Sequence, residues 1–151
     1  MASRPLLVVV DGHSLLYRAF HGVPDTLTNR EGEPTNAIFG FTNMLLNVLR
    51  EWKPAYALVA MDVGRSFRHD KAPEYKANRE AMPDSLRLQE ERARQLLGAL
   101  RIPVIGIEGW EADDIIGTVS KQAEDRGLDV LIVSGDSDAF QLVNDSVRVL
   151  T

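Results

Sequence analysis

Short apolar runs alternate with longer amphipathic stretches along most of the chain. The runs are four to six residues long and are nearly continuous in Val, Leu, Ile, Ala and Met. Such runs are typical of strands that are covered on both faces of a sheet. The pattern predicts strands at residues 6–10, 57–61, 102–105, 128–133 and 147–150.

The amphipathic stretches between these runs predict helices. In the first of them, Ile38, Phe41 and Leu45 recur at helical spacing and would form one apolar face. Thr35 stands where an N-cap is expected, and Gly127 follows the last stretch as a C-cap residue. The helices are expected at residues 35–52, 84–100 and 112–126.

Strands that alternate with helices indicate an α/β fold. We expect three layers, in which a mostly parallel central sheet carries helices on both of its faces. The length of 151 residues suits one domain. A hydrophobic fraction of 44% and a charged fraction of 26% are typical of globular proteins.

The sequence contains no cysteine, which excludes disulfides and thiolate metal sites. This fits a reducing cytoplasm, the expected location. The apolar run before Asp11 is too short for a signal-peptide core or a membrane span, so no membrane partner is expected. A net charge of −5 does not suggest a nucleic-acid binder. A metal-dependent nuclease needs many carboxylates, however, so the distribution of charge decides more than its sum.

One polar segment, residues 63–83, interrupts the alternation. A connection of this length without clear periodicity is usually functional or disordered. Phe67 and Tyr75 lie among its basic residues, a combination that is typical of segments gripping single-stranded nucleic acid. A solvated loop without such a role is the alternative. The basic residues are Arg65, Arg68, Lys71, Lys76 and Arg79.

Aspartates follow three of the predicted strands. Asp11, Asp62 and Asp136 each come at or just after the end of an apolar run. A single Asp in this position is more often a turn or cap residue. Ligands of open α/β sheets bind beyond the carboxyl ends of the strands, so three such acids would meet at one edge of a parallel sheet.

A fourth group of acids stands where the helix at 112–126 begins. Glu111 and Asp114 are three residues apart and would share a helix face. The alternative is that these acids only complement the helix dipole. Combined with the acids at the strand ends, they predict a seven-carboxylate site: Asp11, Asp62, Glu111, Asp113, Asp114, Asp136 and Asp138.

Seven carboxylates in one crevice would repel one another strongly without cations. Hard divalent cations such as Mg²⁺ prefer oxygen ligands and would relieve this repulsion. The histidines at 13, 21 and 69 are scattered and are expected to be core or surface residues, which argues against zinc. Two ions about 4 Å apart would suit hydrolysis of a phosphodiester.

Several segments of the sequence resemble the N-terminal 5′ nuclease domain of bacterial DNA polymerase I, within the flap endonuclease superfamily. They span nearly the whole chain in the expected order. They are VDGHSLLYRAFHG from Val10, TNAIFGF from Thr35, Met61-Asp62, SFRHDKAPEYKANRE from Ser66, GWEADDIIG from Gly109 and SGDSDAFQLV from Ser134. The resemblance implies a PIN-like, resolvase-like fold in which residues 63–83 form a helical arch.

The resemblance also implies roles for single residues. The seven carboxylates would be the metal ligands of the family, which uses Mg²⁺ or Mn²⁺, with two ions in the complete domain. Lys76 and Arg79 would contact the scissile phosphate from the arch, and Tyr75 would stack on the substrate. Arg18 and Arg68 would be further DNA contacts.

The function implied is that of a metal-dependent, structure-specific 5′-3′ exonuclease or flap endonuclease. It would hydrolyse DNA phosphodiesters in replication and repair, in primer removal and flap processing. The partners would be DNA with a 5′ flap, nick or 5′ end, RNA primer–DNA, and a covalently linked polymerase domain.

Family members continue beyond this point with a Gly-Asp-x-x-Asp-Asn stretch, which supplies two more metal aspartates, and with a helix-hairpin-helix-like part. Residues 1–151 are therefore expected to be the N-terminal catalytic part of the domain, without that C-terminal part. Two alternatives stay open. One is a truncated DNA-binding fragment with little or no turnover. The other is a different Mg²⁺-dependent α/β phosphotransferase, which usually has an Asp where this chain has His13.

Overall fold

The computed structural model describes residues 4–63 and 83–151. The predicted arch at 63–83 therefore lies almost entirely outside the described residues. Four of the predicted site residues lie outside them as well, namely Arg68, Tyr75, Lys76 and Arg79.

The described residues form a five-stranded parallel sheet. Its strands are β1 (Leu6–Asp11), β2 (Tyr56–Ala60), β3 (Val104–Ile105), β4 (Asp129–Val133) and β5 (Val147–Leu150). They lie in the order β3-β2-β1-β4-β5, and every pairing is parallel. In the centre of the sheet, Val10 pairs with Val59 on one side and with Val133 on the other. The predicted parallel α/β sheet is confirmed.

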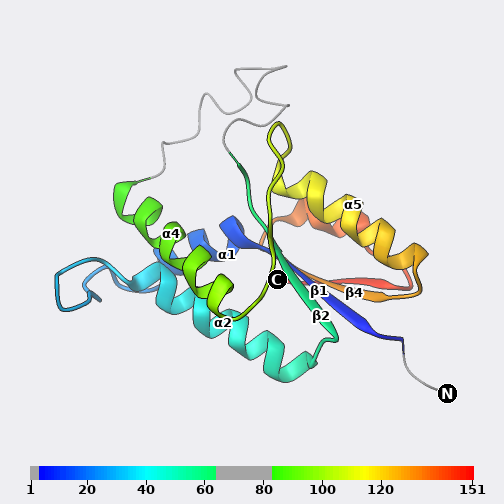
Figure 1. Ribbon diagram of the computed structural model, residues 1–151, viewed down its shortest axis with the longest axis horizontal. Helices are drawn as coiled ribbons and strands as arrows, with labels where there is room; N and C mark the ends of the chain where they lie inside the picture. The colour runs from blue at the N-terminus through cyan, green and yellow to red at the C-terminus, as the bar shows by residue number, and fades with distance from the viewer. Residues whose placement is uncertain (1–3, 64–82) are drawn as a thin grey trace.

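Helices cover both faces of this sheet, as Figure 1 shows. One face carries α1, α2 and α4, which contribute Leu16, Phe41 and Leu97 to its core. The other face carries α5, whose Ile115 and Ile116 pack on the sheet. The helices are α1 (Gly12–Gly22), α2 (Asn36–Trp52), α4 (Asp84–Ala99) and α5 (Ala112–Asp125).

The central strand β1 is buried on both faces because its apolar residues alternate between two cores. Val8 and Val10 point into the core beneath α1, α2 and α4. Leu7 and Val9 point into the core beneath α5. This alternation accounts for the nearly continuous apolar run in the sequence, since both faces of the strand need apolar side chains.

Two elements were not expected from the sequence. Helix α1 begins directly after β1 without a loop, and the Asp11 carboxylate caps it by accepting a 3.3 Å hydrogen bond from the Ser14 N–H. A short 3₁₀ helix, η2 (Ser137–Leu142), follows β4. Both elements begin at an acid of the predicted site, so each fixes the direction in which that acid points.

A buried polar network fixes α4 against α1 and α2. Gln89 on α4 is 1% exposed, and its Nε2–H donates to Asn36 Oδ1 at 3.0 Å. Its Oε1 accepts from the Ile38 N–H at 3.0 Å. Asn36 in turn donates to the Phe20 carbonyl at 2.9 Å. Because every partner is satisfied, the network holds α4 in one position.

The predicted N-cap at Thr35 is confirmed in position, since α2 begins at Asn36. Its side chain makes no capping hydrogen bond, however, and its carbonyl accepts from the Phe39 N–H at 2.9 Å. Gly127 follows α5 with a φ of +82°, which confirms the need for glycine there.

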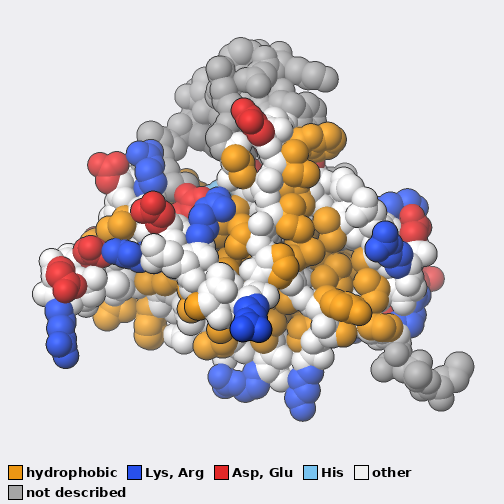
Figure 2. All heavy atoms as spheres, viewed as in Figure 1, with side chains coloured by type: hydrophobic (Ala, Val, Ile, Leu, Met, Phe, Trp, Pro, Cys, Tyr) orange, Lys and Arg blue, Asp and Glu red, His pale blue; other side chains and the backbone are white. Residues whose placement is uncertain are grey.

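On the face of the molecule seen in Figure 2, apolar side chains lie in the centre and charged side chains lie over α4. Among residues 4–63 and 83–151, no helix is long and apolar enough to cross a membrane.

Candidate functional site

The candidate site lies where the strand order reverses. In this sheet β1 is followed along the chain by β2 on one side, and β4 lies on its other side. Ligands of open α/β sheets bind at such a switch point, beyond the carboxyl ends of the two central strands. Asp11 is the last residue of β1, and Ser134 follows the last residue of β4.

Asp11 is buried at this point, with only 6% of its surface exposed. Its Oδ2 accepts a 3.0 Å hydrogen bond from the Ser134 hydroxyl, and its Oδ1 accepts from the Ser14 N–H. Burial raises the pKa of Asp11, and the hydrogen bonds from Ser14 and Ser134 oppose this effect. The carboxylate is thus held in one orientation between β1 and β4.

Three further acids converge beside Asp11. Carboxylate oxygens of Asp113, Asp136 and Asp138 all lie within 4.8 Å of one another. Burial raises the pKa of Asp113 to about 6, and the negative charges of neighbouring acids add to the shift. We call these residues the acidic cluster: Asp11, Glu111, Asp113, Asp136 and Asp138.

The turn after β4 presents the last two of these acids. The Ser134 hydroxyl accepts from the Asp136 N–H at 3.0 Å while it donates to Asp11. Asp136 Oδ1 then accepts from the Asp138 N–H at 2.9 Å, which starts η2. Ser14 accepts from the Gly135 N–H at 2.7 Å and so ties the turn to α1. Neither serine was singled out in the sequence.

The other two predicted acids bind the N-terminus of α5. Asp62 Oδ1 accepts a 2.7 Å hydrogen bond from the Ala112 N–H, and Asp114 Oδ2 accepts a 2.9 Å bond from the Glu111 N–H. Both carboxylates therefore satisfy backbone donors that a helix start leaves without partners. Five of the seven acids form the acidic cluster. Asp62, whose negative charge also raises the pKa of Asp11, and Asp114 bind the start of α5 beside Glu111 and Asp113.

His13 was expected to be a core or surface residue, and the structure places it in the site instead. Its Nε2–H donates to Glu90 Oε1 at 2.9 Å, and its Nδ1 lies 3.6 Å from Asp62 Oδ2. Burial lowers the pKa of His13, but the hydrogen bonds with Asp62 and Glu90 outweigh it and raise the pKa to about 9. No local pattern signals this contact, because Glu90 lies 77 positions away along the chain.

The Asp62 N–H lies 3.4 Å from His13 Nδ1 and would donate to it in the neutral ring. A protonated ring donates from both nitrogens, so its Nδ1–H faces the Asp62 carboxylate instead. With a pKa of about 9, the protonated arrangement holds at neutral pH. In both arrangements Nε2–H donates to Glu90.

Arg18, a predicted DNA contact, lies on α1 at the same edge of the sheet. A Cβ atom added at Gly135 would be 3.0 Å from Arg18 Nη2, so the guanidinium lies against the turn that carries Asp136. The Arg18 side chain is exposed. An anion that approached the acidic cluster from solvent would therefore meet a cation at its margin.

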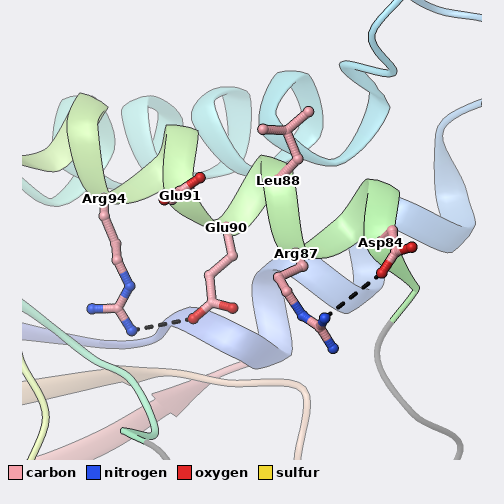
Figure 3. A pocket seen from close by; sticks show the side chains of 6 residues that line it. All are labelled: Asp84, Arg87, Leu88, Glu90, Glu91 and Arg94. Carbon is pink, nitrogen blue, oxygen red and sulfur yellow. Dashed lines mark hydrogen bonds and ion pairs between the residues drawn. The ribbon is translucent and has the colours of Figure 1, made fainter.

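A separate hollow of about 440 Å³ lies along α4 (Figure 3). Its cations are paired within the hollow, Arg87 with Asp84 at 3.6 Å and Arg94 with Glu90 at 3.1 Å. This pairing does not suit an anionic ligand. None of the described residues that line it belongs to the acidic cluster, so we place the chemistry in the cluster and not in the hollow.

The acidic cluster suits hard divalent cations. Its donors are carboxylate oxygens, the ligands that Mg²⁺ and Mn²⁺ prefer. Burial raises the pKa of Asp113 and the negative charges of neighbouring acids add to this, an electrostatic setting that a bound cation would relieve. Among residues 4–63 and 83–151, Asp113, Asp136 and Asp138 are placed closely enough to share an ion.

A family model matches residues 6–151, and its description is 5′-3′ exonuclease, N-terminal resolvase-like domain. DNA polymerase I of Chloroflexus aurantiacus is 55% identical over 146 residues, which are 96% of this chain and 16% of that protein. DNA polymerase I of Bacillus subtilis is 45% identical over 150 residues, or 99% of this chain and 17% of that protein. The chain thus spans about a sixth of the length of the curated relatives it matches.

Solved structures with a similar fold come from T5. The T5 D15 protein, co-crystallised with metal ions, superimposes with a TM-score of 0.70 at 24% identity, over 95% of this chain and 53% of that one. The T5 5′-exonuclease with bound divalent metal ions (zinc) gives a TM-score of 0.69 at 25% identity, over 95% and 54%. These likenesses confirm the resolvase-like α/β fold predicted from the sequence.

Proposed function

The chain belongs to the family of N-terminal resolvase-like domains of 5′-3′ exonucleases, and from this premise we propose that it is the catalytic part of a metal-dependent, structure-specific 5′-3′ exonuclease or flap endonuclease. Its reaction would be the hydrolysis of DNA phosphodiesters in replication and repair. The observation that carries this proposal is the acidic cluster at the switch point of the sheet, centred on Asp113.

We propose Mg²⁺ or Mn²⁺ as the cofactor, with two ions in the complete domain. Asp113, Asp136 and Asp138 would hold an ion together with Asp11 and Glu111, while Asp62, after β2, and Asp114, in the first turn of α5, would contribute as well. When bound, such ions stabilise phosphoryl oxygens and lower the pKa of water. The T5 D15 structure contains metal ions and the T5 5′-exonuclease structure contains zinc, which supports a divalent-metal site but does not choose Mg²⁺ or Mn²⁺.

The remaining predicted residues would act on the DNA. Arg18, at the margin of the cluster, would bind a backbone phosphate near the scissile bond. Lys76 and Arg79 would stabilise the negative charge that develops on that phosphate. Tyr75 would stack on the substrate, and Arg68 would make a further contact.

The proposed partners are DNA with a 5′ flap, a nick or a free 5′ end, RNA primer–DNA, and a polymerase domain on the same chain. The relatives are DNA polymerase I proteins, which supports the link to a polymerase. A T5 D15 flap endonuclease structure is a pseudo-enzyme–product complex with DNA and metal ions, which supports the flap substrate. The cytoplasmic location stays a prediction.

A direct test measures cleavage of a 5′-flap DNA in Mg²⁺ by the wild type and by the double variant Asp113→Asn with Asp136→Asn. It is run on the 151-residue chain and on a longer protein that adds the family's Gly-Asp-x-x-Asp-Asn stretch. We expect the double variant to lose cutting by at least about a hundredfold. Asp145→Asn is the matched control, since Asp145 is exposed on the loop before β5. If the double variant cleaves the flap DNA as fast as the wild type, the proposal is wrong.

The same assay separates the two alternatives. Titration with flap DNA in Ca²⁺ measures binding, and a change to Mg²⁺ then measures cutting. Binding without cutting in both proteins would favour a DNA-binding module. The phosphotransferase alternative lacks support at the decisive position, because His13 is bound between Glu90 and Asp62. Hydrolysis of small phosphate esters that Asp11→Asn abolishes would revive it.

A further inference from the structure

His13, on α1, contacts α4 and the segment after β2 at the edge of the acidic cluster. It lies on α1, its Nε2 is 2.9 Å from Glu90 on α4, and its Nδ1 is 3.6 Å from Asp62 after β2. The side chains of His13 and Glu90 are each only 16% exposed. A hydrogen-bonded pair this well buried fixes both side chains, because an alternative rotamer would leave a buried polar group without its partner.

Glu90 determines how the imidazole ring faces Asp62. Its carboxylate accepts the Nε2–H of His13, so that nitrogen always carries a proton and the ring cannot turn over. The opposite nitrogen, Nδ1, therefore always faces Asp62. Glu90 is itself held by Arg94, whose Nη2 donates to Glu90 Oε1 at 3.1 Å (Figure 3). A carboxylate that fixes a histidine in this way is a common support of metal-site ligands.

Asp62 contacts both His13 and the start of α5. One of its oxygens faces His13, and the other accepts the 2.7 Å hydrogen bond from the Ala112 N–H. Ala112 is the first residue of the helix that carries Asp113. The contacts thus form one series from Glu90 through His13 and Asp62 to the start of α5.

We propose that His13, fixed by Glu90, is a positioning residue that orients the Asp62 carboxylate and, through it, the first turn of α5 for metal binding. This inference rests on the proposed nuclease function. A buried ion pair that only stabilises the fold would explain the distance to Glu90. It would not explain why the other nitrogen faces an acid that also binds the start of α5.

The first experiment needs no metal and no substrate. Hydrogen exchange and the ¹⁵N-resolved proton shift of the Ala112 amide are measured by NMR in the 151-residue chain. In His13→Leu and Glu90→Leu, we expect this amide to exchange about tenfold faster and to move upfield, since its acceptor is no longer held. Glu91→Leu, the exposed neighbour on the same helix, is the matched control and should leave the amide unchanged.

Two conservative variants keep the inference testable if the leucine variants fold poorly. Glu90→Gln retains an oxygen that accepts from Nε2–H, and His13→Asn retains a polar atom near the position of Nδ1. We expect both to keep the Ala112 amide closer to wild type than the leucine variants do. If all four variants leave the Ala112 amide as it is in the wild type, His13 does not position Asp62 and the inference fails.

The second experiment measures function. Mn²⁺ affinity is determined by calorimetry, and kcat and KM are determined on 5′-flap DNA. In His13→Leu we expect Mn²⁺ affinity and kcat to fall about 10- to 100-fold, with KM for DNA changed less than about twofold. A fall in thermal stability with unchanged Mn²⁺ affinity and kcat would show a purely structural role. If the wild type cuts no DNA, the proposed function fails, while Mn²⁺ affinity and the Ala112 amide still decide the role of His13.

Discussion

Asp62 Oδ1 accepts a 2.7 Å hydrogen bond from the backbone N–H of Ala112. Asp62 lies two residues after the end of β2 and Ala112 is the first residue of α5, so this bond ties the segment after β2 to the start of the helix. It also gives the positive end of the helix dipole a carboxylate partner.

We expect Asp62→Ala to lower the free energy of unfolding by about 1–2 kcal/mol, because the first turn of α5 loses a charge-assisted acceptor. Urea unfolding followed by circular dichroism measures the change. Asp145→Ala removes an exposed acid and should stay within about 0.5 kcal/mol of wild type. Equal stabilities for both variants would show that the bond to Ala112 contributes nothing.

The pKa of Asp113, raised to about 6 by burial and by neighbouring acids, has a consequence for the metal-free protein. The pKa of Asp113 in the unfolded chain is 3.8. Above this pH the native state must carry a negative charge that it disfavours, so the contribution of Asp113 to stability falls as the pH rises from about 4 to 6. At pH 7, Asp113→Asn should stabilise the metal-free protein by about 1 kcal/mol, a figure discounted for the partial exposure of the group.

Metal binding should show the opposite trend, since protons and cations compete for the cluster. The increase in Tm that Mg²⁺ gives over EDTA is expected to be small at pH 5 and to grow as the pH rises through 6. Differential scanning calorimetry at several pH values measures it, and Asp113→Asn serves as the comparison. A Tm increase that is the same at pH 5 and pH 8 would contradict the assignment.

His13 should stabilise the fold below its raised pKa. Because the native pKa of about 9 exceeds the unfolded value of 6.5, its contribution is fully present below pH 6.5 and is lost as the pH rises through 9. We expect His13→Gln to cost about 2–3 kcal/mol at pH 6 and much less at pH 10. Proton NMR titration of the ring gives the pKa directly, with the signal that disappears in His13→Gln assigned to His13.

Gln89→Leu should destabilise the protein by about 2–4 kcal/mol, since the Ile38 N–H and Asn36 Oδ1 would lose their partners in the core. Chemical denaturation measures this loss. Gln95→Leu lies on the same helix with an exposed side chain and should change stability by less than about 0.5 kcal/mol. A similar cost for both would mean that the buried network adds no stability.

Arg18→Ala should weaken binding of flap DNA in Ca²⁺ and reduce the slope of log affinity against log salt by about 1, as expected for the loss of one phosphate contact. Fluorescence anisotropy at several salt concentrations measures both quantities. Arg101→Ala is a suitable control because Arg101 lies at the far end of α4, beyond Leu100. An unchanged salt slope would remove Arg18 from the DNA contacts.

The strands and three helices could be predicted because their apolar spacing follows local rules. Each predicted boundary lies within two residues of the structure, as for α5, expected at 112–126 and found at Ala112–Asp125. Helix α1 was missed because no turn signal separates it from β1, and Asp11 serves as both strand end and N-cap.

The acids could be located from the sequence, but their directions could not. Parallel strands bring Asp11 and Asp136 to one edge, and this follows from topology alone. Asp114 and Asp62 point at backbone donors of α5, which depends on how the helix start is placed. The contact of His13 with Glu90 joins residues 77 positions apart and depends on the packing of α4, which no local pattern reveals.

The central place of β1 has a consequence for the order of assembly. Its partner β4 begins at Asp129, so Asp11 meets the Ser134 hydroxyl only when residues 129–134 have joined the sheet. Closing a chain segment of this length carries an entropy cost that must be met before the contact can form. The residues from Asp11 to Ser134 must therefore all be synthesised before these acids can gather, so a growing chain that ends before Ser134 has no assembled acidic cluster.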